Sequence, residues 1–252
     1  MSTLKVRALW LGLAPLVLLA PLRAYGADTT PERTLVYNFS WSMDQVVSAG
    51  GTDSESTSVN WSTAPMDMRY YGNAVNSKGT ITAEIMGTQP DGGVIVSIVM
   101  EGQNVPAMSP ATCVAYGNTA VICDPNKSVY GAEFTLLRFL GSNFVDPNRL
   151  DASKHWRLSH DYGDRVEQAD YTIGGSSGST IQIGETRKVE ETTGRKSTSN
   201  VDTKIGYDVS RSVPVSVQEY VTTRGDNGDA GFSKSTYQTT LDLASDTMAK
   251  AP

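Results

Sequence analysis

The sequence predicts a mostly β protein, in which one large curved antiparallel sheet, a half-barrel or barrel-like meander, carries one or two short helices over its apolar face. Apolar and polar residues alternate along most of residues 34–243, turn-forming residues separate the alternating segments, and one apolar segment has helical spacing. Such alternation is typical of antiparallel strands with one wetted face, whereas parallel strands form continuous apolar runs. The apolar face of this sheet needs a cover, and the helices are expected to supply it.

Residues 1–26 are predicted to be a cleavable signal peptide. A short basic start precedes an apolar run over 8–22, and the small residues Ala24 and Gly26 stand at the −3 and −1 positions of the expected cleavage site. A retained anchor needs about 20 uninterrupted apolar residues. We therefore expect residues 27–252 to form a single antiparallel β domain with short flexible ends, exported to the periplasm or the extracellular space without a stable membrane anchor.

The first predicted strand begins at residue 35 and is followed by a hairpin. Its apolar residues occupy every second position and should share one face: Leu35, Tyr37, Phe39, Trp41 and Met43. A second alternating segment at 80–85 leads through a glycine-containing turn at 87–93 into the more continuously apolar segment 94–100, which predicts paired strands.

The two cysteines, Cys113 and Cys123, are expected to form a disulfide across a short hairpin. If residues 117–119 are the loop, the two cysteines lie directly opposite each other on adjacent strands. Export would place them in an oxidising compartment, where pairing is the default. A redox-active pair is the alternative, but the close Cys-x-x-Cys spacing of such pairs is absent.

The helical cover is predicted at residues 131–141, and a second short helix is predicted to begin at Asp146-Pro147. The first segment places five large apolar residues within two or three turns, and Gly141 is positioned to end it. In the second, Asp is a suitable N-cap and Pro a suitable first helical residue. Neither segment recurs after every strand, so we do not expect a βαβ fold.

The C-terminal part is predicted to contain the longest strands. Alternation runs through residues 200–209, 213–221 and 237–243, with turn residues between the segments. Around residue 156, a strand is expected in which Trp156 is in the core and His155 and His160 are exposed. A metal or acid–base role for the two histidines is the alternative, but a spacing of five residues on a strand puts them on opposite faces.

No residue is assigned a catalytic, metal-binding or cofactor-binding role, so we do not expect an enzyme. Residues 174–178 satisfy the G-x-S-x-G pattern of esterases, but an alternating segment follows where a helix is required, which favours a hairpin loop. Residues 226–229 resemble a small calcium loop but lack the ligand spacing of an EF-hand, and a tight turn explains them.

The charge of the chain disfavours nucleic acid as a partner. The formal net charge is −6, with 27 acidic against 21 basic residues. Phosphate binding needs a concentrated basic surface. The nearest candidate, Arg187-Lys188, is interleaved with Glu185 and Glu190, which we interpret as a solvated acidic face.

The remaining candidate site is an apolar groove beneath the helical cover. The residues predicted to line it are Tyr37, Phe39, Trp41, Trp61, Phe134, Leu137, Leu140, Trp156, Tyr207 and Tyr237. A curved sheet could leave space here for an acyl chain or another hydrophobic molecule. The alternative is that these side chains form a closed, fully packed core.

In its order of elements, the chain resembles the half-barrel periplasmic lipoprotein carriers and related lipid-binding proteins. The resemblance lies in pattern and topology: an export leader, long antiparallel strands and a helical segment between two halves. It implies an exported, non-enzymatic protein that binds a hydrophobic small molecule or lipid, either an acyl chain or a lipidated partner. The alternative is a structural or envelope-assembly protein with a packed core that acts through contacts with another envelope protein.

Overall fold

The computed structural model describes residues 30–48, 76–117, 120–127, 129, 131–141, 144–145, 154–161, 163–191, 193, 196–226 and 232–248. Within these residues the chain forms one open sheet of eleven antiparallel strands with one short helix. The predicted mostly β fold is therefore confirmed. The predicted signal peptide at 1–26, Trp61 and the second helix at Asp146 lie outside the described residues.

The strands follow one another along the chain with the helix between the fifth and the sixth. In chain order they are β1 (Arg33–Ser48), β2 (Asn76–Thr88), β3 (Val94–Gln103), β4 (Ala111–Ala115), β5 (Val121–Cys123), α2 (Gly131–Arg138), β6 (His155–Asp161), β7 (Arg165–Ser177), β8 (Thr180–Glu191), β9 (Ser197–Asp208), β10 (Val213–Asp226) and β11 (Phe232–Met248).

The sheet consists of two meanders joined at its centre. The order of strands across it is β5-β4-β3-β2-β1-β11-β10-β9-β8-β7-β6. Each half is the meander that the alternation predicts, but the first and last strands pair with each other, from Arg33 opposite Met248 to Ser48 opposite Phe232. The short strand β5 and the strand β6 are the two edges.

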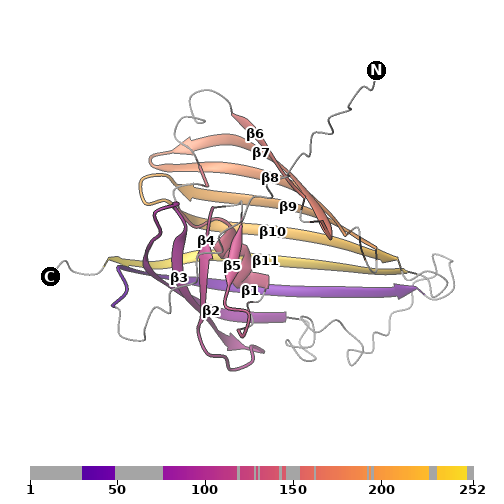
Figure 1. Ribbon diagram of the computed structural model, residues 1–252, viewed down its shortest axis with the longest axis horizontal. Helices are drawn as coiled ribbons and strands as arrows, with labels where there is room; N and C mark the ends of the chain where they lie inside the picture. The colour runs from indigo at the N-terminus through magenta and orange to yellow at the C-terminus, as the bar shows by residue number, and fades with distance from the viewer. Residues whose placement is uncertain are drawn as a thin grey trace, which may run out of the picture.

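One face of the sheet, called the inner face below, is covered by α2 and by the β3–β5 end. Figure 1 shows β4 and β5 crossing in front of β10, β11 and β1. Helix α2 contacts β1, β10 and β11 on one side and β3 and β5 on the other. Helix α2 ends at Arg138, before the predicted end at residue 141, and Gly141 follows with a positive φ of 99°, which favours glycine.

The helix inserts apolar side chains into a continuous core. Leu136, Leu137, Phe139 and Leu140 are fully buried, and they pack with the inward side chains of β1, β2 and β3. Farther along, the Phe144 ring lies edge-on to Tyr207, with centroids 5.1 Å apart. Such close aromatic packing fills most of the space under the cover.

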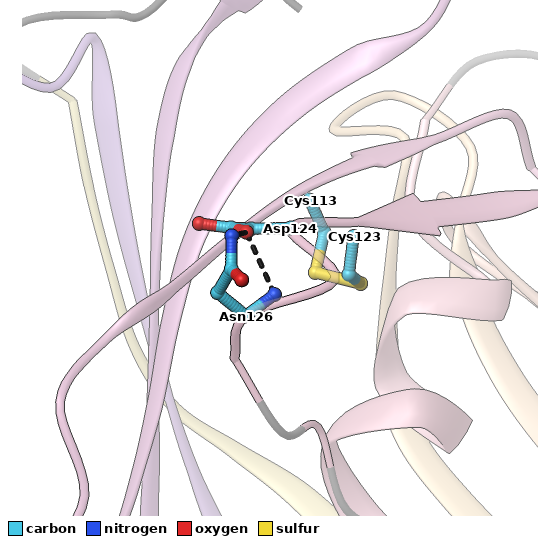
Figure 2. The surroundings of a disulfide bond; sticks show 4 residues. All are labelled: Cys113, Cys123, Asp124 and Asn126. Atoms are coloured by element: carbon cyan, nitrogen blue, oxygen red, sulfur yellow. Dashed lines mark hydrogen bonds between the residues drawn. A yellow bond between two sulfur atoms is a disulfide. The ribbon is translucent and has the colours of Figure 1, made fainter.

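The predicted disulfide between Cys113 and Cys123 is present. The two residues are direct cross-strand partners on β4 and β5, with Cα atoms 4.0 Å apart. Figure 2 shows the bond beside the turn that follows β5, where the Asp124 carboxylate accepts hydrogen bonds from the backbone and side-chain amides of Asn126. The disulfide is consistent with an oxidising, extracytoplasmic location.

Two turns show how the local sequence sets the strand ends. Residues 174–177 are the end of β7 and only Gly178, at a φ of 60°, lies in the turn to β8, so the hairpin loop is shorter than predicted. A strand and not a helix follows the G-x-S-x-G pattern. The strand predicted over 200–209 ends one residue early. The Asp208 carboxylate accepts hydrogen bonds from the backbone amides of Ser210 and Arg211, which turns the chain and leaves Val209 exposed.

Candidate functional site

A row of polar side chains crosses the otherwise apolar inner face. The strand register places one inward residue of each of seven strands side by side, and all of them are buried. From β6 to β1 the row consists of Trp156, Tyr171, Glu185, Thr203, Glu219, Thr239 and Trp41. On one side of it lies an apolar row that contains Ile183, Ile205 and Leu241. The polar row therefore crosses the apolar core along a single line of cross-strand neighbours.

Helix α2 attaches to this row through Arg138. The guanidinium donates to both oxygens of Glu185, at 2.5 and 2.7 Å, and to Glu219 Oε2 at 2.6 Å. The Thr135 hydroxyl donates to the other Glu219 oxygen at 2.7 Å. Glu185 also accepts from the hydroxyls of Tyr171 and Thr203, each at 2.7 Å. Both carboxylates are thus held by several charge-assisted or hydroxyl hydrogen bonds.

The ionisation of this cluster is set by the balance between burial and pairing. Burial alone raises the pKa of the Glu185 carboxyl, but the guanidiniums of Arg138 and Arg187 and two hydroxyl donors lower it more, so the net shift is downward. Burial alone lowers the pKa of Arg138, and the two glutamates raise it above its ordinary value. Glu185 and Arg138 are therefore charged at neutral pH.

The sequence interpretation of this segment as a solvated acidic face is corrected here. Lys188 and Glu190 are exposed, but Glu185 is buried and the side chain of Arg187 is only 14% exposed. The alternation itself contained the signal, because the odd-numbered residues of β8 point inward, beginning with the buried Ile181 and Ile183. Charged residues are usually exposed, and this general preference was wrong for Glu185 and Arg187.

Next to the polar row, a hollow of about 420 Å³ opens between α2, β5 and strands β6 to β8. The residues that line it are Ala120, Val121, Ile122, Phe134, Arg138, Leu158, His160, Arg165, Glu167, Ala169, Tyr171 and Arg187. We call it the α2–β7 hollow. Phe134 is 40% exposed and Ile122 48% exposed, so its walls carry accessible apolar surface. The hollow lies within the size range of ligand sites.

Arg187 lines this hollow as a largely buried cation, with a side chain that is 14% exposed. Its Nε is sealed from solvent and has no hydrogen-bond partner in the described part of the chain. The carboxylates of Glu167 and Glu185 each lie 3.6 Å from one of its nitrogens, which is an ion-pair distance and too long for a hydrogen bond. Burial and the adjacent Arg138 both lower the pKa of Arg187.

The predicted groove residues are distributed differently from the expectation. Phe134 lines the α2–β7 hollow. Tyr237 is half-buried against Trp41, with ring centroids 6.1 Å apart. The other described members are buried in the core: Tyr37, Phe39, Trp41, Leu137, Leu140, Trp156 and Tyr207. The space therefore lies at the edge of the cover and not beneath its centre.

The two histidines lie on opposite faces of β6, as their spacing predicts. His155 points outward and its Nε2 lies 3.3 Å from Asp170 Oδ1. His160 is half-buried and lines the α2–β7 hollow, so the expectation that both are exposed is wrong for His160. Within the described ranges, no group of three or more His, Cys, Asp or Glu side chains could hold a metal ion.

A second hollow, of about 550 Å³, lies on the outer, polar face of the sheet. Its lining combines exposed residues of β7 to β11, among them Tyr220, which is 42% exposed, with four buried members of the polar row, Glu185, Thr203, Glu219 and Thr239. It contains no buried group that lacks a partner among the described residues. The α2–β7 hollow combines apolar walls with a buried cation, and we therefore treat it as the candidate site.

The fold and the site define an open antiparallel β-sheet protein with a single-helix cover and an amphipathic hollow. No known family profile matches the chain, and no curated protein matches it. Among solved structures, one described as "Lipid-protein interactions in lipovitellin" is similar, at 11% identity and a TM-score of 0.49. The match covers 89% of this chain but only 26% of that one, and likeness at this level carries no argument about function.

In the described residues, no helix is long and apolar enough to cross a membrane.

Proposed function

We propose that the protein is a non-enzymatic binding protein for a hydrophobic ligand with a single acyl chain, held in the α2–β7 hollow. The observation that supports this proposal most directly is the position of Phe134 and Ile122. Large apolar side chains of the described residues are otherwise mostly buried, but these two are exposed and both line the hollow. Accessible apolar surface that gathers in one concave place is typical of a ligand site.

The size of the hollow favours one chain over several. A water molecule occupies about 30 Å³ in the liquid, and a methylene group is of similar size. A volume of about 420 Å³ therefore accommodates a single chain of medium length but not the several chains of a lipidated protein. Each methylene removed from water contributes about 0.8 kcal/mol, so one chain can supply a useful affinity.

The disulfide and the predicted leader support binding outside the cytoplasm. The clip between Cys113 and Cys123 fixes β5, whose Val121 and Ile122 form one wall of the hollow. Persistence of this bond requires an oxidising compartment. We therefore propose that the ligand is bound after export.

A structural or envelope-assembly role is the competing function, and the dense core supports it. Seven of the ten predicted groove residues are buried in one hydrophobic core. In this alternative, the exposed apolar residues at the hollow would meet another protein and not a lipid.

Binding of dodecan-1-ol by the purified, lipid-free protein tests the proposal, with displacement of a neutral naphthylamine dye as the measurement. Phe134→Asp should weaken the affinity by about tenfold or more, because a carboxylate replaces a ring in the apolar wall. The matched control is Tyr220→Asp, which changes an equally exposed aromatic residue on the outer face and should leave the affinity unchanged. Absence of saturable binding, or equal losses in both variants, would contradict the proposal and favour the structural role.

A further inference from the structure

Arg187 occupies a place where the strand register otherwise puts hydrocarbon. Its row on the inner face lies beside the polar row, and its cross-strand partners are Ala169 on β7 and Val201 on β9. Both partners are small or aliphatic and buried. They have no side-chain acceptor to offer a guanidinium, whose five N–H groups each need one.

Each neighbouring carboxylate already accepts from another donor. Glu185 accepts four short hydrogen bonds from Arg138, Tyr171 and Thr203. Glu167 pairs with Arg165 through Oε1 at 3.0 Å, and its Oε2 lies 3.6 Å from Arg187, beyond hydrogen-bond distance. Arg187 therefore has charge compensation at 3.6 Å but no direct acceptor among the described residues. Because Nε is sealed, a ligand in the hollow would reach the guanidinium through its other nitrogens, and an acceptor that bears a charge would form the stronger kind of hydrogen bond there.

The part of Arg187 that is not sealed lines the α2–β7 hollow, together with Phe134 and Ile122. A ligand in this hollow thus meets apolar walls and a buried guanidinium at the same time. We infer that the ligand is a single-chain fatty acid whose carboxylate is held by Arg187. This inference rests on the proposed function and adds the chemistry of the head group.

A carboxylate fits this position better than a phosphate monoester. Glu167 lines the same hollow, and its negative charge repels a doubly charged head group more strongly than a singly charged one. The planar fork of a guanidinium also matches the two oxygens of a carboxylate in a bidentate pair. His160 and Arg165 complete the polar end of the hollow.

The experiment compares dodecanoate with dodecan-1-ol on the folded, oxidised protein. The two probes share the same chain length and differ in the head group. Wild-type protein should bind dodecanoate about ten- to a hundredfold more tightly, the range expected for hydrogen bonds to a charged group. Arg187→Met should reduce dodecanoate to the affinity of the alcohol and leave the alcohol unchanged.

The control is Arg157→Met, which removes the same charge from a residue that does not line the hollow. The side chain of Arg157 is 68% exposed and pairs with Asp170, so its loss should change the dodecanoate affinity less than about threefold. Arg187→Lys keeps the charge without the fork and should give an intermediate affinity. It also serves as the second variant if Arg187→Met does not fold.

The possible failures are distinguishable. If wild-type protein binds the acid and the alcohol equally, the head-group inference is wrong and the apolar ligand stands. If Arg157→Met and Arg187→Met weaken dodecanoate binding equally, the attraction is a general effect of positive charge and not a specific contact with Arg187. Tighter binding of dodecyl phosphate than of dodecanoate would overturn the choice of carboxylate. If none of the three probes binds, the proposed function itself fails.

Discussion

Helix α2 is held by hydrocarbon along most of its contact with the sheet and by buried charge at one point. Leu136 and Leu137 are fully buried among the apolar residues of the core. Arg138, the next residue, is buried equally well but is held by two glutamates of β8 and β10. The same alternating strand pattern supports both kinds of contact, and only the residue at the inward position differs.

The difference between the two kinds of contact explains why the hollow lies beside the charged cluster and not within the apolar core. Apolar side chains can adjust and interdigitate until no space remains, as they do around Leu137 and Phe139. Charged side chains must satisfy fixed geometry, and the cluster of Arg138, Glu185 and Glu219 therefore sets where α2 can lie. The space left beside it, at the β6 edge, is the α2–β7 hollow.

The largest expected effect comes from breaking the charged attachment. Arg138→Met should reduce the free energy of unfolding by about 3–5 kcal/mol, because it leaves Glu185 and Glu219 buried without their cation. Urea unfolding followed by circular dichroism measures the change. The control is Arg157→Met, an arginine whose side chain is 68% exposed and paired with Asp170, which should cost less than about 1 kcal/mol. Equal losses of stability in the two variants would show that the buried ion pairs of Arg138 contribute no more than the exposed pair of Arg157.

A smaller effect is expected from removing the covalent clip at the far edge. Replacing both Cys113 and Cys123 by alanine should cost about 2–3 kcal/mol, because the bond closes a short loop between residues ten apart in sequence. Loss of the clip should also weaken binding in the hollow, since β5 forms its wall. Reduction of the wild-type protein should reproduce both changes. An unaltered unfolding midpoint would show that the bond contributes nothing to stability.

The smallest effect is expected in the pH dependence of stability. The folded pKa of Glu185 lies below its ordinary value of 4.5, so the unfolded state binds more protons in this range. The stabilisation is present at neutral pH and is lost as the pH falls below about 4.5 and through the folded pKa. Glu185→Gln should flatten this acid slope, as measured by urea midpoints across the acidic range. An unchanged slope in the variant would assign the acid sensitivity to other carboxylates.

The parts that the sequence predicts well are those in which a local pattern reports a local geometry. The side-chain period of two identified the inward residues of β1, from Leu35 to Met43, because only a strand places every second residue on one face. The loop length alone put Cys113 opposite Cys123. The glycine at 141 marked the end of the helical cover.

The parts that the sequence does not predict depend on contacts distant in the chain. Nothing near Arg33 indicates that it pairs with Met248. Phe134 was expected to line a groove and does line the hollow, but the contacts that orient the helix, from Arg138 to Glu185 and Glu219, involve strands far along the chain. The alternation in β8 predicts that Glu185 and Arg187 point inward. They were assigned to the solvent-exposed face only because they are charged.

The pairing of β1 with β11 determines when the complete sheet can form during folding. The seam at the middle of the sheet joins the first strand to the last, so the two meanders remain separate until the C-terminal strand has been synthesised. Such pairing over nearly the whole length of the chain makes folding slow, because the entropy of closing the loop is lost before the contacts form. Until then β1 presents an unpaired edge, the kind of surface that chaperones shield from aggregation.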